Sequence, residues 1–367
     1  MNKDNNLKVA IVCDWLNGIG GAELVVLQLH KMFPNAPIYT SQYDPKKIDW
    51  FNDADVRTTW VNMLPGKLKK FLPVLRAFSF SHLNLKEFDL VISSTGAEAK
   101  AVKFNKNATH ISYCHSPTHY YWVRYDEYLK NPGFGKLDWL ARIGLKTLVG
   151  PMKKWDFKAA QNPSYLLTNS NFSKSNILKY YKRESTVIYP PVDVATYSQN
   201  VNDSSNRDGY IVIGRQTPYK FFGLAVEACT KLNKKLVVIG DGPENSRLKS
   251  IAGPTIQFLG QIDNKQKLEN LNNSKALIFP GIDDFGITAI EAMAAGTPVI
   301  AFKAGGALDY VDQTNGLFFE EQTVESLCRA INLMEQTSFD SQKVSLSVSH
   351  FSPVNFEQKL SDFINNL

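Results

Sequence analysis

The sequence predicts an α/β protein with two domains, each built on a parallel β-sheet. Short apolar runs alternate with helical patterns from end to end, and each run stops at a turn, as buried parallel strands do. The alternation pauses at a polar stretch over 193–208 and then restarts. The chain has 367 residues, 44% of them hydrophobic, which is enough for two cores of ordinary size. These observations predict two Rossmann-like domains, 1–193 and 194–352.

The individual elements follow from the same patterns. In the first domain we expect a helix over 20–32 and strands over 7–13, 88–93, 109–114, 165–170 and 186–189. Pro190 and Pro191 then stop regular structure, and 193–208 is interpreted as a linker. In the second domain the expected strands are 210–214, 235–240, 255–260, 276–280 and 298–301.

The last segment, 353–367, has the pattern of an amphipathic helix. Its apolar side chains Phe356, Leu360, Phe363 and Ile364 share one side. We expect this helix to return to the first domain and pack against it.

Charge and cysteine content narrow the class of protein. The net charge is +6, with 26 basic and 16 acidic residues up to Asp193 and 15 and 19 after it. A basic half suits nucleic acid, a membrane or an anionic substrate, and charge alone leaves these open. Four scattered cysteines without a CxxC pair argue against a zinc site or a disulfide framework. Without a signal peptide or a spanning run, we expect a cytoplasmic protein.

Glycine-rich and basic loops follow several of the predicted strands, where this fold class binds ligands. Gly20 and Gly21 stand between the first strand and its helix, where backbone amides can approach an anion. Arg215 and Lys220 straddle Pro218 and can converge on one diphosphate. Taken singly, a tight turn explains the glycines equally well, and two solvated cations in a loop are the commoner explanation of an isolated pair such as Arg215 and Lys220.

Two further strand ends suit a nucleotide lying over the edge of the second sheet. Gly240 opens a Gly-Asp-Gly-Pro-Glu turn, and Gln261 and Ile262 follow the next strand, where backbone groups can read a base. Either feature alone is also an ordinary turn.

The acidic loop after the 276–280 strand is the most specific motif. It contains Asp283 and leads through Gly286 into a helix that carries Glu291, eight positions on. The two carboxylates can bracket a polyhydroxyl ligand while the helix N-terminus donates amides to its phosphate. A capped surface helix explains any short piece of this string but not the whole.

Together these motifs resemble family 4 of the retaining glycosyltransferases, which has the GT-B fold of two Rossmann-like domains facing a cleft. The likeness covers the second domain, and extends into the first through Gly-Gly-Ala-Glu (20–23) and the His-Ser-Pro segment from His115 to Trp122. A narrower resemblance, carried by that segment and by Asp-Phe-Gly-Ile-Thr (284–288), is to bacterial GDP-mannose-dependent mannosyltransferases of polysaccharide and O-antigen assembly, including lipopolysaccharide.

The resemblance implies a role for each motif. Arg215 and Lys220 would stabilise the departing diphosphate, and Glu291 would hold the ribose hydroxyls. Asp283 would contact the sugar, although it replaces the usual Glu with a shorter side chain. The remaining implied roles are His115 beside the transferred sugar, and donor contacts from Gly20, Gly21, Gly240, Gln261, Ile262, Phe285, Gly286 and Ile287. Without the resemblance, an interior histidine is the better interpretation of His115.

The implied reaction is a hexosyl transfer from a nucleotide sugar to a glycan or polyprenyl-linked glycan, with retention. No residue identifies itself as a covalent nucleophile, so we expect front-face attack. The Asp53-Ala54-Asp55 triplet matches a DxD metal motif but lies in a polar stretch of the first domain. We therefore expect no metal and no other cofactor.

Two basic, apolar segments of the first domain are candidates for membrane contact. They are 67–78, with four cations and no acid, and 134–158, with six cations and two acids. Such segments can lie at an anionic membrane surface, here the inner face of the cell membrane. A helix with its apolar side in the core and its lysines outward fits equally well.

Other classes of protein share some of these features. A UDP-sugar-dependent transferase of the same family and a GT-B nucleotide-sugar epimerase would both have the same fold. The epimerase has no need for the pairing of the basic loop with the two acids. A two-lobed solute-binding protein should carry an export signal, and no recognised nucleic-acid-binding module is present.

Overall fold

The computed structural model describes residues 7–64, 73–130, 138–199, 201 and 207–367. The chain divides into two compact units. The first comprises 1–191 with 356–367, and the second comprises 192–355. Each unit is built on one large parallel sheet, which confirms the predicted α/β class.

The sheet of the first unit has seven strands in the order β3-β2-β1-β5-β7-β8-β9, all paired in parallel. These are β1 (Val9–Cys13), β2 (Ile38–Thr40), β3 (Val56–Thr58), β5 (Leu90–Thr95), β7 (Thr109–Cys114), β8 (Tyr165–Thr168) and β9 (Thr186–Val187). A separate parallel pair joins β4 (Asn84–Leu85) to β6 (Lys103–Phe104). The chain order reverses between β1 and β5, so loops after these two strands meet at one point of the sheet edge.

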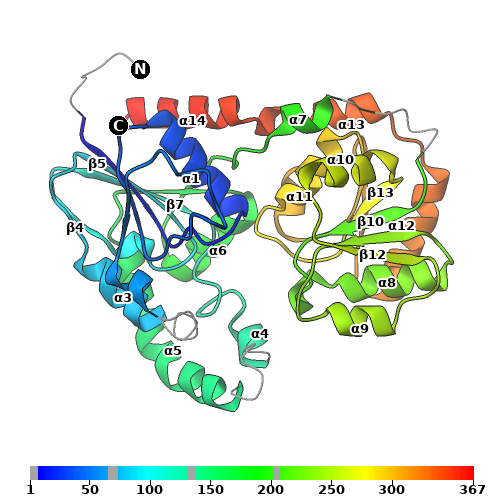
Figure 1. The fold of residues 1–367 in the computed structure, drawn as a ribbon, viewed down its shortest axis with the longest axis horizontal. Helices are drawn as coiled ribbons and strands as arrows, with labels where there is room; N and C mark the ends of the chain where they lie inside the picture. The colour runs from blue at the N-terminus through cyan, green and yellow to red at the C-terminus, as the bar shows by residue number, and fades with distance from the viewer. Residues whose placement is uncertain (1–6, 65–72, 131–137, 200, 202–206) are drawn as a thin grey trace. The chain divides into compact units, whose positions relative to one another are not determined.

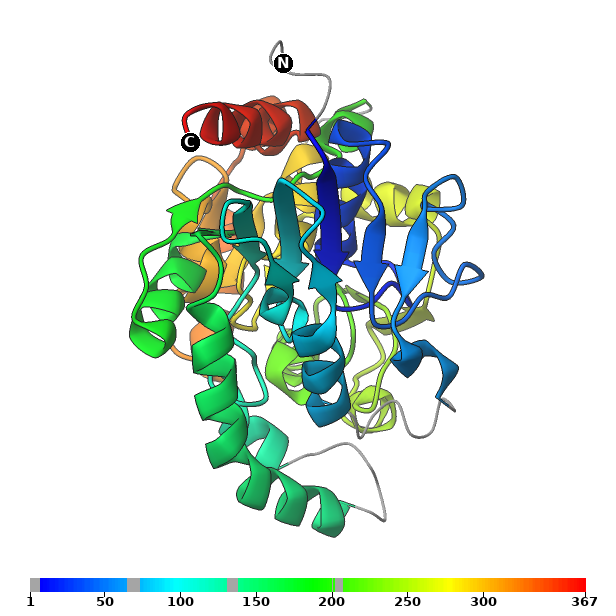
Figure 2. The same ribbon diagram turned by 90° about the vertical axis from the view of Figure 1, so that its left-hand side faces the viewer.

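Helices connect the strands of this unit, as parallel pairing requires. They are α1 (Gly21–Met32), α3 (Pro73–His82), α4 (Tyr125–Lys130), α5 (Asp138–Ala160) and α6 (Asn171–Tyr181). In Figure 2, α5 runs from the sheet into a long projection beyond it. The predicted strands in this unit are all present, with ends shifted by no more than two residues, whereas the short strands β2 and β3 were not predicted.

The C-terminal helix α14 (Pro353–Asn365) belongs to the core of the first unit from Phe356 onward. Phe356 and Leu360 are buried in the same cluster as Val9 and Ile11 of β1. Figure 1 shows α14 beside α1, and the Gln28 side chain donates a hydrogen bond to Glu357 across this contact. The amphipathic pattern therefore predicted the buried face of this helix correctly.

The sheet of the second unit has six parallel strands in the order β12-β11-β10-β13-β14-β15. They are β10 (Tyr210–Ile213), β11 (Leu236–Ile239), β12 (Ile256–Gly260), β13 (Ala276–Phe279), β14 (Val299–Phe302) and β15 (Gly316–Phe319). The chain order reverses between β10 and β13. This switch point places the basic loop after β10 next to the acidic loop after β13.

Helices lie on both faces of this sheet, with α8 (Phe222–Lys231) and α9 (Asn245–Ser250) on the side opposite α10 (Asn264–Asn273) and α11 (Ile287–Ala294) in Figure 1. The others are α7 (Val194–Ser198), α12 (Val324–Gln336) and α13 (Ser341–Ser347). The stretch interpreted as a linker, 193–208, begins with the short helix α7. Asp193 caps this short helix by accepting from the Thr196 amide, and Val194 and Tyr197 are buried.

Two further findings concern the cysteines and the possibility of a membrane-spanning helix. The four cysteines are buried, and none of them forms a disulfide. Within the described ranges, no helix combines the length and apolar character needed to cross a bilayer.

Candidate functional site

Loops from four strands of the second unit come together at the switch point of its sheet. Glycines allow this close approach. A Cβ atom on Gly240 would lie 2.0 Å from the Gly214 carbonyl oxygen, and one on Gly242 would lie 2.5 Å from that of Gln216. The loops after β10 and β11 therefore touch through their backbones. Side chains at Gly240 and Gly242 would separate them.

The acidic loop after β13 is held in the same way. A Cβ on Gly281 would lie 3.0 Å from the Lys220 Cα, so this loop packs on the basic one. On its other side, the Gly306 amide donates to the Asp283 carbonyl at 2.9 Å, and a Cβ on Gly306 would lie 2.5 Å from the Phe285 Cα. The loop around Asp283 therefore packs closely against two neighbouring segments, with Gly281 at one contact and Gly306 at the other.

Lys220 and Asp283 form an ion pair at the centre of these loops. Their side chains are 21% and 14% exposed, so the pair is largely shielded and still open to solvent on one side. The structure therefore brings together two of the predicted site residues that are 63 positions apart in sequence. A cation and a carboxylate side by side can meet, respectively, a phosphate and a sugar hydroxyl.

Arg215 lies on the same loop but is exposed and does not share this pair. Its Nη2 donates to the Tyr219 hydroxyl at 3.0 Å. Burial raises the pKa of Tyr219. The adjacent Arg215 guanidinium, and to a lesser degree Lys220, lower it by more than burial raises it, so the pKa of Tyr219 lies below its usual value. This arrangement shows a concentration of positive charge on the loop, which suits an anionic ligand.

The start of α11 points backbone amides toward this region. Gly286 caps the helix with a φ of 99°, and a Cβ there would lie 2.5 Å from the Tyr310 hydroxyl oxygen and 2.7 Å from the Phe279 ring. Tyr310 donates to the Phe285 carbonyl at 2.7 Å and so fixes this turn. The amides of Phe285, Gly286 and Ile287 stand at the positive end of the helix, where an anion is favoured.

Glu291, on the second turn of α11, is held by two residues that the sequence did not suggest. Lys267 on α10 reaches both of its carboxylate oxygens at 3.0 Å, and the Tyr197 hydroxyl of α7 donates to one of them at 3.1 Å. Burial and the Glu291 charge raise the pKa of Tyr197. The Lys267 ammonium also lies 5.1 Å from the Tyr197 ring centroid. The carboxylate is therefore fixed in orientation, as a group that recognises hydroxyls should be.

The remaining predicted donor contacts of this unit lie at neighbouring strand ends. The Gly240 amide donates to the Gly260 carbonyl at 2.7 Å, which joins the ends of β11 and β12. Gln261 and Ile262 follow directly after β12 and precede Asp263, the N-cap of α10. Because Lys267 is on that same helix, the β12 end and Glu291 are structurally connected.

The first unit has its own set of polar groups at its switch point. Asp14 follows β1 and is buried, and its carboxylate accepts from the backbone amides of Gly96, Ala97 and Ala99 at 2.8–3.0 Å and from the Thr95 hydroxyl at 3.0 Å. It therefore binds the loop after β5 to the end of β1. Sequence reasoning missed this role, although an acid directly after a buried strand is a signal for it.

The predicted Gly20 and Gly21 contacts lie at the start of α1, beside a buried acid. Gly20 caps the helix in an extended conformation, and a Cβ on it would lie 2.9 Å from the Glu23 carboxylate oxygen. Burial raises the pKa of Glu23 to about 7, with a further contribution from the charge of Asp14 and a partial offset from a backbone hydrogen bond. This helix start can thus change its charge near neutral pH.

His115 is half-buried at the carboxyl end of β7. Its Nε2 lies 2.8 Å from the Ser94 hydroxyl, and its ring meets that of Tyr113 edge-on with centroids 5.1 Å apart. A Cβ on Gly96 would lie 4.0 Å from the His115 Cβ. The loop held by Asp14 and the predicted His115 are therefore neighbours within the first unit.

The segment after His115 is anchored by a buried charge. Asp156 of α5 pairs with Lys100 at 2.7 Å, and both side chains are at most 1% exposed. The same carboxylate accepts from the Thr118 hydroxyl at 2.9 Å and from the Trp122 indole and Tyr181 hydroxyl at 2.7 Å. Removing one partner of such a pair would be strongly destabilising.

The Asp53-Ala54-Asp55 triplet does not form one site. Asp53 lies 3.7 Å from the His30 ring, whereas Asp55 pairs with Arg57 at 2.7 Å on the surface. In the part of the chain that the structure describes, no three His, Cys, Asp or Glu side chains gather as a metal-binding group.

Comparisons with known proteins place these loops in context. Residues 194–345 match the family described as glycosyl transferases group 1, and this range includes both the Lys220–Asp283 pair and Glu291. The alpha-1,3/1,6-mannosyltransferase ALG2 of Dictyostelium discoideum is 24% identical over 99% of each chain. The D-rhamnosyltransferase WbpZ of Pseudomonas aeruginosa is 26% identical, over 42% of this chain and 42% of its own.

Among solved structures, HepE of Anabaena in complex with UDP superposes with a TM-score of 0.72 at 18% identity. The superposition covers 98% of this chain and 100% of that one. At this identity the likeness concerns the fold, and it confirms the predicted GT-B class.

Proposed function

We propose that the chain is a group 1 glycosyltransferase that transfers mannose from GDP-mannose to a glycan or lipid-linked glycan, with retention. The observation that carries the proposal is the meeting of Lys220, Asp283 and the start of α11 at one switch point. A cation, a carboxylate and a helix N-terminus are the groups that a sugar diphosphate requires there.

The diphosphate would be neutralised mainly by Lys220. Its ammonium would leave the Asp283 carboxylate and bind a phosphate oxygen instead. The helix amides of Gly286 and Ile287 would donate hydrogen bonds to another phosphate oxygen. Arg215, exposed on the same loop, adds charge from the solvent side. Stabilising the charge that develops on a leaving group is worth about 3–4 kcal/mol for one well-placed donor.

The nucleoside would be held by Glu291. Lys267 and Tyr197 fix the orientation of its carboxylate, whose oxygens can accept from two neighbouring ribose hydroxyls. Asp283 would then be released from Lys220 to contact hydroxyls of the sugar. The proposal gives each charged group of this cluster a partner on the donor.

The reaction itself needs one bond formed and one broken. The acceptor hydroxyl oxygen attacks the anomeric carbon as its bond to the diphosphate oxygen breaks. The departing phosphate oxygen takes the proton of the attacking hydroxyl, which places attack and departure on the same face and gives retention. Because Lys220, Arg215 and the helix amides supply the positive charge, the proposal requires neither a metal ion nor another cofactor.

The donor is inferred from proteins similar to this chain. The names of several relatives describe mannosyltransferases, and the names of three of them specify GDP-Man and a PP-Dol-linked acceptor. These names support GDP-mannose and a lipid-linked acceptor as the first choice. The UDP in the HepE structure makes a UDP-sugar the second candidate.

A lipid-linked acceptor would place the reaction at a membrane. The described part of the candidate segment 134–158 lies in α5, where Trp139, Leu140 and Ile143 are 58%, 45% and 52% exposed. This exposure favours surface contact over core packing for the outer part of the helix. Residues 67–72 and 134–137 of the two segments lie outside the described residues. We therefore propose peripheral attachment at the inner face of the cell membrane.

Donor turnover tests the proposed activity. The protein is incubated separately with GDP-mannose and UDP-glucose, with and without a membrane extract as acceptor source. Release of GDP together with radiolabelled mannose in the lipid fraction is the expected result. Conversion of the free nucleotide sugar to its epimer without acceptor would identify an epimerase, and an absence of turnover with both donors would contradict the proposal.

A further inference from the structure

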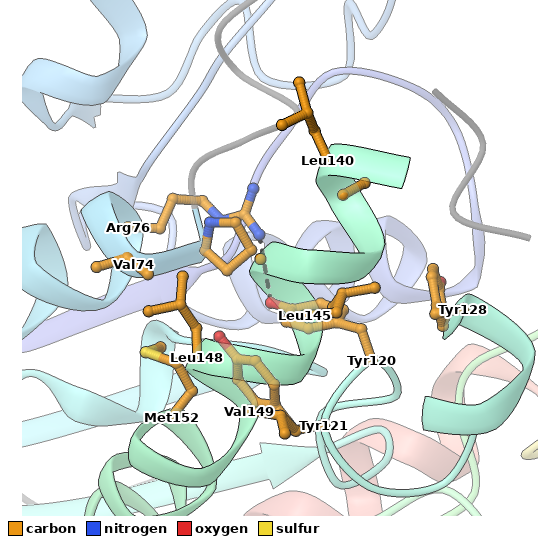
Figure 3. A pocket seen from close by; sticks show the side chains of 13 residues that line it. Val74, Arg76, Tyr120, Tyr121, Tyr128, Leu140, Leu145, Leu148, Val149 and Met152 are labelled. Carbon is orange, nitrogen blue, oxygen red and sulfur yellow. Dashed lines mark hydrogen bonds between the residues drawn. The ribbon is translucent and has the colours of Figure 1, made fainter. Parts of the chain in front are cut away.

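A cavity lies in the first unit, beside the segment that follows His115. It has a volume of about 390 Å³ and lies among α3, α4, α5 and the segment of Tyr120 and Tyr121. Figure 3 shows the side chains that line it, with Leu145, Leu148, Val149 and Met152 of α5 between Val74 of α3 on one side and Tyr128 of α4 on the other. Its size falls within the range of small-molecule sites.

The cavity lining is apolar, and its one charged side chain among the described residues already has a partner. Of the described residues around the cavity, Arg76 alone is charged, and its Nε donates to the buried Glu98 at 2.9 Å. The Tyr120 hydroxyl is bound between these two side chains. A ligand that carried a charge into the cavity would lose its hydrogen bonds to water without gaining an ion-pair partner. The lining therefore suits a hydrocarbon chain.

The cavity opens onto an apolar, basic surface. Val74, Leu140 and Leu148 line it and are still 42%, 45% and 49% exposed. The helix α5 carries five cations and two acids, and one of these acids, Asp156, is buried against Lys100. The solvent-facing charge of α5 is thus strongly positive, which complements a phosphorylated head group next to an apolar chain.

We propose that this cavity binds the first isoprenoid units of the lipid-linked acceptor, with their diphosphate against the cations of α5. The inference rests on the proposed function, because only a lipid-linked acceptor brings such a chain to this protein. Three tyrosine rings, those of Tyr120, Tyr121 and Tyr128, and the branched side chains of α5 form walls for a methyl-branched, unsaturated chain. The chain would position the acceptor rather than take part in bond making.

Two glycines of α5 provide a matched pair of variants. Gly144 lines the cavity, whereas Gly150 of the same helix does not, and a Cβ on either would meet no atom within 4 Å. Gly144→Leu places a side chain in the cavity, and Gly150→Leu places the same side chain on the exposed side of the helix. Gly144→Leu replaces a helical glycine by a better helix former and should not lower stability. Gly150 precedes Pro151, whose ring crowds a Cβ on the residue before it, so the melting temperature of Gly150→Leu is measured before it serves as the control.

Binding of geranylgeranyl diphosphate to the full chain, measured by calorimetry, tests the proposal. The wild type and Gly150→Leu should bind it with equal affinity, and Gly144→Leu at least tenfold more weakly. Equal affinity in all three proteins would overturn the proposal. So would binding of inorganic diphosphate as tight as that of the probe, which marks a site for the head group alone, or equally tight binding of dodecyl phosphate, which marks a site for straight membrane chains.

The same three preparations separate this proposal from the proposed function. Stabilisation by GDP and hydrolysis of GDP-mannose by water depend on the second unit and should be equal in all three. If GDP has no effect but Gly144→Leu still loses the probe, the proposed donor is wrong and the isoprenoid site is supported. If GDP stabilises each protein and the probe binds each equally, the proposed donor is retained and the isoprenoid site is refuted.

Discussion

Lys267 contacts both carboxylate oxygens of Glu291 at 3.0 Å, across two helices that the sequence separates by 24 positions. The two side chains are 17% and 14% exposed, so the pair is mostly screened from water. Lys267 does not belong to the motifs recognised in the sequence, yet it determines how the acid of the most specific motif is presented. The donor site therefore depends on α10 as well as on the loops that carry the motifs.

Lys267→Ala is expected to raise the KM for the donor about tenfold and to change kcat by less than threefold. The reason is that Glu291 would keep its charge but lose the partner that orients it toward the ribose, which weakens binding in both the ground and transition states. Steady-state kinetics measure the split. Lys265→Ala on the same helix is the control, and an equal fall in kcat and kcat/KM would refute a positioning role.

Lys220→Ala is expected to lower kcat by about two to three orders of magnitude while leaving the fold intact. The departing diphosphate would lose the cation nearest to it, an effect comparable to the removal of an oxyanion-hole donor. The rate of nucleotide release with saturating donor measures this loss. Lys231→Ala, which removes an exposed cation of α8, should retain full activity. Near-normal turnover of the Lys220 variant would remove this residue from the proposed mechanism.

GDP should raise the melting temperature more than UDP or ADP at equal concentration. A ligand that binds only the folded state stabilises it by about 2.7 kcal/mol at a hundred times its Kd, so the order of the shifts reports the order of affinities. Differential scanning fluorimetry gives the comparison directly. A larger shift with UDP would exclude the mannosyl-donor proposal and favour the UDP-sugar alternative.

Glu23→Gln should change how stability depends on pH. Burial raises the pKa of Glu23 to about 7 from its ordinary 4.5, so between these values the folded protein binds more protons than the unfolded chain. The free energy of unfolding therefore falls as pH rises through this window, by about 3 kcal/mol for this one group. Because glutamine cannot ionise, the variant should not show this fall in the free energy of unfolding.

The difference between variant and wild type isolates this effect. Melting temperatures should coincide near pH 4.5 and diverge up to pH 7, with the variant more stable above that. His110, whose pKa burial lowers to about 3, acts in the opposite direction but is present in both proteins and cancels. Parallel curves from pH 4.5 to pH 8 would show that Glu23 titrates normally.

The segment 67–78 should confer reversible, salt-sensitive binding to anionic vesicles. Each cation near the lipid surface contributes about 1 kcal/mol, screened over a Debye length of about 8 Å at physiological salt. Replacing Lys67, Lys69 and Lys70 with Glu should reduce sedimentation with such vesicles and transfer to a lipid-linked acceptor, but not hydrolysis of the donor. The matched control replaces Lys46, Lys47 and Lys106 with Glu. No vesicle binding by the wild type at low salt would indicate a soluble acceptor.

The local patterns of the sequence determined the strands and the loops that follow them. A strand buried on both faces must be apolar throughout, so β1, β7 and β10 were recognisable from their own residues. Glycines that permit close backbone approach, as at 240 and 286, are equally local signals. For the same reason the loop of Asp283 and the helix of Glu291 were recognisable from the sequence.

Only the tertiary structure decided which of these residues meet and what surrounds them. Asp14 binds amides more than 80 positions away, and Tyr197 binds Glu291 from 94 positions away. Tyr197 lies in the stretch 193–208, whose composition is that of a linker. Such pairings depend on strand order and on where each sheet reverses, neither of which is encoded in a single segment. The cavity beside α5 has the same origin, because its walls come from three helices that are separate in sequence and adjacent only after folding.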